Sequence, residues 1–122
     1  MVIVIADDEG LIAELVAEVA REAGHTTIVV ADGRAALEAM RRERPALLIT
    51  DLMMPRMTGA ELIEELRAHA AAHGYAPVPI IVMTAARAQQ AAAVGADAVL
   101  YKPFDLDALD ALLTRFLGTG SA

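Results

Sequence analysis

The chain has 122 residues, 57% of them hydrophobic, and its 17 acidic and 10 basic residues give a net charge of −7. This length suits one domain with a substantial core, while the negative charge and the 3% aromatic content argue against direct binding of nucleic acid. No apolar run approaches the roughly eighteen residues of a membrane span, no secretory leader pattern precedes the first strand and cysteine is absent, so we expect a cytoplasmic protein without disulfides or membrane insertion.

Strand-like and helix-like stretches alternate along the whole chain. Continuous apolar runs rich in β-branched residues indicate strands covered on both faces, and apolar residues spaced three or four apart indicate the helices between them. In chain order we expect a strand over 2–6, a helix over 11–23, a strand over 25–30, a helix over 34–42, a strand over 46–51, a turn at 58–59, a helix that includes residues 62–66 and ends near 73–74, a strand over 80–84, a short helix over 85–94, a strand over 98–101 and a last helix that includes residues 106–116. Asp32 and Asp105 are placed to cap the helices that follow them. The residues of the last helix expected to point inward are Leu106, Leu109, Leu112, Leu113 and Phe116.

Strands joined by helices, without an Asn-Gly or Asp-Gly hairpin, predict a parallel sheet with helices on both faces. Right-handed crossovers then favour an α/β, doubly wound, flavodoxin-like fold, with five strands in the order 2-1-3-4-5 and five helices. We expect one domain over residues 1–117 and a flexible tail over 118–122.

Four of the five expected strands end in a polar or charged group. Asp7 and Asp8 follow the first strand, and Asp51, Thr84 and Lys102 end or follow the third, fourth and fifth. Because the carboxyl ends of parallel strands share one edge of a sheet, these side chains should converge. Two carboxylates about 4 Å apart repel by roughly 4 kcal/mol at an effective dielectric near 20, so three of them need a cation or must take up a proton. Lys102 supplies one positive charge, and an all-oxygen ligand set favours Mg²⁺, for which Mn²⁺ could substitute.

A site of this composition suits phosphoryl transfer, which needs positioning and neutralisation of charge. Asp51 would attack phosphorus and form an acyl phosphate, while Asp7 and Asp8 would hold the metal. Lys102 would pair with a phosphoryl oxygen, and the Thr84 hydroxyl would donate a hydrogen bond to another. Each residue also has a simpler explanation, such as a helix-capping acid or a solvated lysine, but their joint occurrence at one sheet edge favours a functional site.

The chain resembles the receiver domains of two-component response regulators, of which the chemotaxis regulator is a single-domain example. The resemblance extends from Ile3 to Leu117, and its most specific segments are residues 5–9, 50–59, 83–85, 95–97 and 101–104. It implies that a sensor histidine kinase or a histidine phosphotransfer protein is the phosphoryl donor, that the output is a downstream protein target, and that the chain is a monomer or weak dimer. Such a domain catalyses its own phosphorylation and dephosphorylation but acts mainly as a signalling switch.

The resemblance also implies roles for individual residues. Asp51 is then the phosphoacceptor, and Mg²⁺ is bound directly by Asp8, Asp51 and the backbone carbonyl of Met53. Asp7 holds a water molecule bound to the metal. The bond between Lys102 and Pro103 is expected to be cis, because the cis form costs only a small free energy before proline.

Three features depart from the family pattern. The segment between residues 84 and 95 is about four residues short, which corresponds to a fourth helix about one turn, or some 6 Å, shorter. Val99 stands where many members carry Tyr or Phe, and it has too little reach for the inward swing of that aromatic ring. We therefore expect that coupling from Asp51 to the distal face, which the family forms from the fourth helix, fifth strand and fifth helix, is weaker or runs through another element. Met53 and Ala86 stand where the family places side chains near the attacking water, and since neither is acidic or an amide, we expect slow self-dephosphorylation.

Two other functions stay open. A phosphatase of the haloacid dehalogenase type also forms an aspartyl phosphate, but its nucleophile follows the first strand, where Asp7 is a poor match for its motif. A pseudo-receiver would keep the fold and bind partners independently of phosphorylation, although no expected site residue is missing. His25, His69 and His73 are expected to be surface residues rather than metal ligands.

Overall fold

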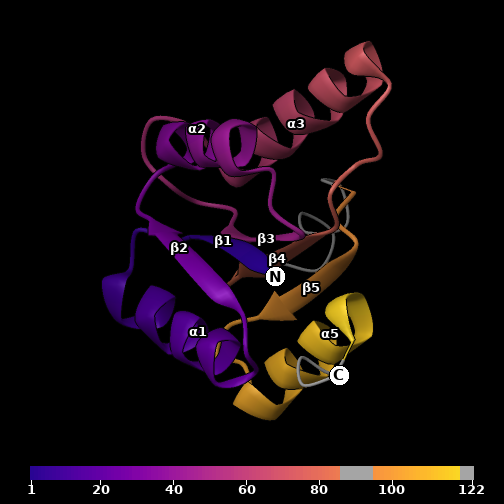
Figure 1. The fold of residues 1–122 in the computed structure, drawn as a ribbon. Helices are drawn as coiled ribbons and strands as arrows, with labels where there is room; N and C mark the ends of the chain where they lie inside the picture. The colour runs from indigo at the N-terminus through magenta and orange to yellow at the C-terminus, as the bar shows by residue number, and fades with distance from the viewer. Residues whose placement is uncertain (86–94, 119–122) are drawn as a thin grey trace.

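The structure, a computed structural model, describes residues 1–85 and 95–118, which fold into a parallel sheet between two layers of helices (Figure 1). The strands are β1 (Val2–Ala6), β2 (Thr26–Val30), β3 (Leu47–Asp51), β4 (Ile80–Thr84) and β5 (Ala98–Tyr101). All neighbouring strands are parallel, and the five-stranded sheet has the order β2-β1-β3-β4-β5. The predicted doubly wound α/β fold and its strand order are confirmed.

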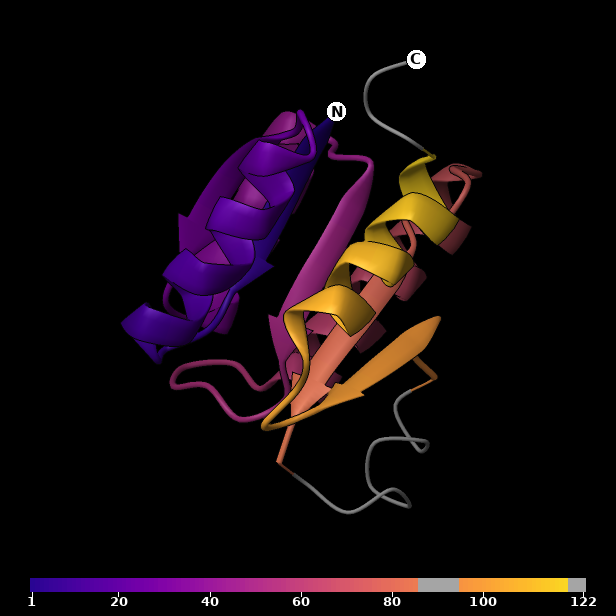
Figure 2. The ribbon, with the colours of Figure 1, turned by 90° about the horizontal axis from the view of Figure 1, so that it is seen from below.

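The helices lie on both faces of this sheet. They are α1 (Gly10–Glu22), α2 (Gly33–Glu43), α3 (Gly59–His73) and α5 (Leu106–Leu117). Helices α2 and α3 cover one face, and α1 and α5 lie together on the other (Figures 1 and 2). The helix expected over 85–94, with its predicted shortening, lies outside the described residues from residue 86 onward. None of the helices in 1–85 and 95–118 has the length and apolar character needed to cross a membrane.

The core has two halves, one on each face of the sheet. Successive residues of a strand point to opposite faces, so each buried strand contributes to both halves. On one face Val4, Leu48 and Val82 pack against α2 and α3. On the other, residues such as Ile49 and Met83 pack against α1 and α5. This double burial explains why the strands read as unbroken apolar runs in the sequence.

Local capping rules set the starts of three helices. The carboxylates of Asp32 and Asp105 accept hydrogen bonds from the backbone N–H groups of Ala35 and Asp107, at 2.8 and 2.9 Å, as predicted. Thr58 caps α3 through a reciprocal pair of hydrogen bonds with Glu61, at a position where the sequence predicts only a turn. This box fixes the point at which the loop after β3 becomes helix.

Two expectations about burial are wrong. Leu106 is 43% exposed, because it is the first residue of α5 and the helix packs on the sheet through Leu109 and Leu113 further along. His25 was expected at the surface but is only 6% exposed. The tight connection from α1 to β2 turns it inward, where its N–H donates to the carbonyl of Ala20 and its ring lies 3.4 Å from the terminal amino group of Met1.

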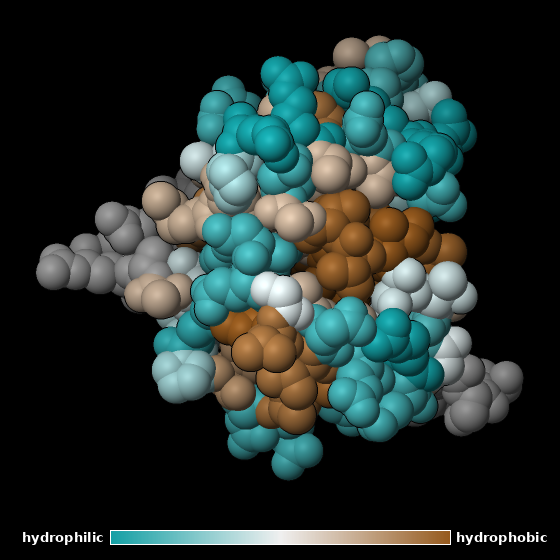
Figure 3. Space-filling view, turned by 90° about the vertical axis from the view of Figure 1, so that its left-hand side faces the viewer, coloured by the Kyte–Doolittle hydropathy of each residue, from teal (hydrophilic) through white to brown (hydrophobic). Residues whose placement is uncertain are grey.

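Apolar surface remains on the side of the molecule that carries α1 and the edge strand β2 (Figure 3). The large hydrophobic side chains exposed on these two elements are Leu11, Leu15 and Val29. Leu11 is 85% exposed at the beginning of α1, directly after the loop that follows β1. This surface therefore adjoins the carboxyl edge of the sheet.

Candidate functional site

The register of the sheet brings the ends of its strands to nearly the same level. Asp51 is the last residue of β3, and the last residues of β4 and β5 lie at nearly the same level of the sheet. Asp7 lies one residue beyond the end of β1. The pairs at the strand ends are Ala6 with Thr50, Asp51 with Met83 and Thr84 with Tyr101.

Three carboxylates gather at this edge. Asp7, Asp8 and Asp51 each offer one oxygen, and these oxygens all lie within 4.8 Å of one another. Asp7 and Asp51 are buried, whereas Asp8 is exposed. The oxygen-only composition and the close spacing fit a hard divalent cation such as Mg²⁺. The residues named from the sequence as metal-binding acids therefore come together in the fold.

Lys102 lies among these acids. Its Nζ is 3.0 Å from Oδ2 of Asp7 and 3.4 Å from Oδ2 of Asp51, and it lies 3.2 Å from Oε1 of Glu9. Burial lowers the pKa of Lys102, but the hydrogen bond that its ammonium donates to Asp7 and the charges of Asp51 and Asp7 outweigh this effect and raise that pKa above its usual value. The ammonium group is therefore charged at neutral pH and links the first, third and fifth strands.

Burial raises the pKa of the Asp51 carboxyl above its ordinary value, because the ionised form loses hydration. The charge of Lys102 opposes this shift, the charge of Asp7 adds to it, and hydrogen bonds from the backbone N–H groups of Met53 and Leu52 oppose it. The charge of Lys102 therefore does not offset the combined effect of burial and of the neighbouring Asp7 charge on the pKa of Asp51. A further cation at this position would stabilise the ionised form of Asp51.

Thr84 and Met53 flank the cluster. Thr84 is buried at the end of β4, and its backbone carbonyl accepts a hydrogen bond of 2.8 Å from the N–H of Lys102. Met53 lies in the loop after β3 with its side chain 69% exposed. The bond between Lys102 and Pro103 is cis, as expected.

One charged neighbour of the cluster, Glu9, was not assigned to this site from the sequence. Besides its ion pair with Lys102, its backbone N–H donates a 2.9 Å hydrogen bond to Oδ1 of Asp7. The acidic run from Asp7 to Glu9 was the available signal, but an ion pair between residues 9 and 102 depends on the folded chain.

A second contact supports the loop that follows Asp51. Arg56, in left-handed backbone conformation at φ 68°, makes a 2.8 Å ion pair with Asp32, the capping residue of α2. The loop is thus tied to the start of a helix on the neighbouring face. Side-chain charge and capping chemistry together limit the positions this loop can take.

Comparison with known proteins gives one consistent family. Residues 3–114 match the family model described as the response regulator receiver domain. The chain is 37% identical over 106 residues to the DNA-binding response regulator MtrA of Mycobacterium tuberculosis, covering 84% of this chain and 44% of that protein. It thus spans about half the length of the curated relatives it matches.

Solved structures agree in fold. The chemotaxis response regulator CheY4 of Vibrio cholerae matches with a TM-score of 0.82 and 32% identity, over 95% of this chain and 98% of that one. The receiver domain of Saccharomyces cerevisiae Ssk1, in a co-crystal structure with the histidine phosphotransfer protein Ypd1, matches with a TM-score of 0.87 and 23% identity, over 95% of this chain and 88% of that one. At that identity the Ssk1 match concerns the fold alone.

Proposed function

The chain belongs to the response regulator receiver domains, and we propose that it accepts a phosphoryl group on Asp51 from a phosphohistidine in a two-component phosphorelay. The observation that carries this proposal is the buried Asp51 carboxylate beside the ammonium of Lys102, within reach of two further acids. A nucleophile placed in this way meets positive charge on one side and a cation-binding cluster on the other. Both are what a transferring phosphoryl group requires.

In the proposed step, an oxygen of Asp51 attacks phosphorus and forms a P–O bond. The P–N bond to the donor histidine breaks, and its electron pair leaves with the imidazole, which takes up a proton. Lys102 pairs with one phosphoryl oxygen, and the Thr84 hydroxyl donates to another. The reaction needs no change of oxidation state, and positioned charge supplies most of the catalysis.

Mg²⁺ is the proposed cofactor, with Mn²⁺ able to replace it. Asp8, Asp51 and the Met53 carbonyl would bind it directly, and Asp7 would hold one of its water molecules. When bound, the ion neutralises charge on the carboxylates and phosphoryl oxygens. The three convergent carboxylate oxygens support this assignment.

The proposed donor is a histidine kinase or a histidine phosphotransfer protein, in keeping with a cytoplasmic location. The exposed Leu11 lies at the start of α1, next to the loop that carries Asp8 and Glu9. An apolar side chain beside the site suits a helical partner that presents its histidine to Asp51. A Leu11→Asp change is then expected to slow transfer from a phosphorylated donor protein and leave reaction with acetyl phosphate unchanged.

The proposed output is binding of a downstream protein target. Phosphorylation of Asp51 would change the conformation of the domain, with weak coupling to the distal face. Val99 is partly buried against the half of the core that α2 and α3 cover, and Tyr101 is half-exposed. Amide hydrogen exchange of the segment from residue 95 to 104, with and without a beryllofluoride phosphoryl mimic, tests this. Large changes in protection there would contradict weak coupling.

Intact mass after incubation with acetyl phosphate and Mg²⁺ tests the proposed function. The chain should gain one phosphoryl group, and the gain should disappear in Asp51→Ala and without divalent metal. Asp97→Ala, which removes an acid at the other edge of the sheet, serves as the control and should react normally. A pseudo-receiver that acts by binding alone would show no gain in any variant.

A further inference from the structure

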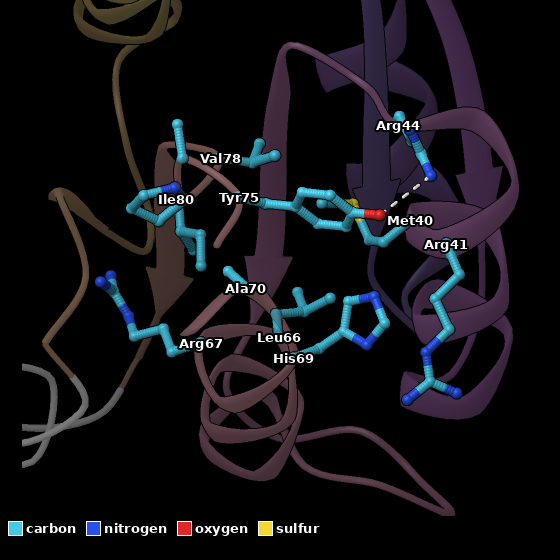
Figure 4. Close-up of a pocket in the computed structure, with 12 residues that line it drawn as sticks. Met40, Arg41, Arg44, Leu66, Arg67, His69, Ala70, Tyr75, Val78 and Ile80 are labelled. Atoms are coloured by element: carbon cyan, nitrogen blue, oxygen red, sulfur yellow. Dashed lines mark hydrogen bonds between the residues drawn. The ribbon is translucent and has the colours of Figure 1, made fainter. Parts of the chain in front are cut away.

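A pocket of about 290 Å³ opens at the edge of the sheet opposite Asp51. It lies between the ends of α2 and α3 and the loop that enters β4, as Figure 4 shows. Its apolar lining includes Met40, Leu66, Val78 and Ile80. A concave apolar site with a few polar groups at its rim is the usual form of a small-molecule site.

The rim of this pocket is cationic. On one side Arg44 reaches the Tyr75 hydroxyl, and Arg41 and His69 lie further along the same side (Figure 4), while Arg67 lines the other side. None of the described residues that line it is acidic. This is unexpected in a chain of net charge −7, and it makes the pocket an attractive place for a negative group.

The positive charge here is only partly compensated. Arg67 donates a 2.7 Å hydrogen bond to the carbonyl of Gly95 and lies 3.7 Å from Asp97, so the carboxylate of Asp97 partly neutralises its charge. Arg41 makes no ion pair within residues 1–85 and 95–118. Burial lowers the pKa of His69, and the neighbouring His73, Arg41 and Arg44 lower it further. His69 therefore favours its neutral form, and the positive charge on this side of the pocket comes from Arg41 and Arg44.

An aromatic ring is held at the mouth of the pocket. Arg44 lies over the ring of Tyr75, 5.2 Å from its centroid, and its Nη2 lies 3.4 Å from the Tyr75 hydroxyl. The rings of Tyr75 and His73 stack with their centroids 5.5 Å apart. These contacts with Arg44 and His73 hold the ring of Tyr75 in place at the mouth of the pocket.

We propose that this pocket binds a small organic anion, with its apolar body against Met40, Leu66 and Val78 and its carboxylate or phosphate at Arg41. The site is separate from the carboxylates around Asp51, so binding there does not depend on the proposed phosphorylation. Arginine suits this role because its planar group pairs with two oxygens of one anion.

Titrations of the full chain followed by ¹H–¹⁵N correlation spectra test the proposal. The probes are phenylacetate and phenyl phosphate, which distinguish the two anionic groups, with benzyl alcohol as the neutral body and inorganic phosphate as the bare charge. At least one of the first two should give saturable shifts in residues 40–44, 66–70 and 75–80. Benzyl alcohol and inorganic phosphate should bind at least about tenfold more weakly, because the first lacks the anionic group and the second lacks the apolar body.

Arg41→Gln is the test variant and Arg42→Gln its matched control, because Arg42 is the next residue of α2 and pairs with Glu43 outside the pocket. Arg41→Gln should weaken binding about tenfold, and Arg42→Gln should leave it nearly unchanged. Asp51→Asn should bind the probe like the natural chain, which separates this proposal from the phosphorylation. Equal binding by Arg41→Gln, equal binding of benzyl alcohol, or the absence of saturable shifts with both anions would overturn it.

Discussion

Gly59, the first residue of α3, packs directly against the backbone carbonyl oxygen of Asp51, and the contact leaves no room for a side chain at this position. Its N–H also donates a 2.8 Å hydrogen bond to the carbonyl of Leu52. The start of α3 therefore fixes the backbone of Asp51 and Leu52, and with it the position of the Asp51 carboxylate. The position of that carboxylate depends on a glycine eight residues away in the sequence.

Gly59→Ala is accordingly expected to disturb both stability and reaction. A methyl group here would push against backbone atoms, which have little freedom to move, so the free energy of unfolding should fall by about 1–3 kcal/mol. Phosphorylation by acetyl phosphate should slow about tenfold or more, because Asp51 is displaced. Gly10→Ala is the control, since nothing lies within 4 Å of a Cβ added there. Similar behaviour of the two variants in urea unfolding and in the kinetic assay would refute the proposed constraint.

Lys102→Met removes the ammonium that lies between Asp7 and Asp51. Without divalent metal at neutral pH, the two buried acids would then repel each other uncompensated, and the variant should lose about 3 kcal/mol of stability. Added Mg²⁺ should restore more stability to the variant than it adds to the natural chain, because the ion replaces the missing positive charge. Urea unfolding with and without MgCl₂ measures both effects, with the surface change Arg42→Met as control. A loss that Mg²⁺ leaves unaltered would show that the acids do not share a cation site.

Thr58→Ala removes the side-chain half of the capping box at the start of α3. The expected cost is about 1 kcal/mol of unfolding free energy, and Thr58→Ser should retain most of the stability because it keeps the hydroxyl. The N–H of Glu61, which now donates to that hydroxyl at 3.2 Å, would lose its partner in the alanine variant. Chemical denaturation compares the three chains, and equal loss in both variants would point to the methyl group of Thr58 instead.

His25 should make stability depend on pH in the acidic range. Burial lowers the pKa of His25, and the charge of the chain's amino terminus lowers it further. Since an unfolded histidine has a pKa near 6.5, the unfolded chain binds more protons than the folded one below about that pH. The stabilising contribution of neutral His25 is therefore complete above pH ~6.5 and is lost as the pH falls from there toward the folded-state pKa.

His25→Gln should flatten this part of the stability profile, measured by urea unfolding between about pH 5 and 7.5. His69→Gln is the control for the other histidine with a lowered pKa, which lies at the surface of the pocket between α2 and α3. An unchanged slope in the His25 variant would mean that its ring is not shielded from protonation.

Much of the fold followed from local patterns in the sequence. Strands buried on both faces give unbroken apolar runs, and capping acids such as Asp32 and Asp105 mark helix starts through contacts only two or three residues long. The convergence of Asp7, Asp51 and Lys102 followed from strand order alone, because parallel strands end at one edge.

Other features depended on contacts that no local pattern reveals. His25 lies in a short turn, where no periodicity indicates which way a side chain points, and its burial was missed. The Glu9–Lys102 ion pair joins residues far apart in the chain. The cationic pocket depends on how α2 and α3 pack together, so its arginines read in the sequence as ordinary surface residues.

The most direct measurement is to identify which residue carries the phosphoryl group. After reaction with acetyl phosphate and Mg²⁺, sodium borohydride reduces an aspartyl phosphate to homoserine, and tandem mass spectrometry of peptides locates the change. We predict homoserine at residue 51 alone. Reduction at Asp7 would favour the phosphatase alternative, and an unmodified Asp51 under conditions that phosphorylate other receiver domains would contradict the phosphoacceptor role.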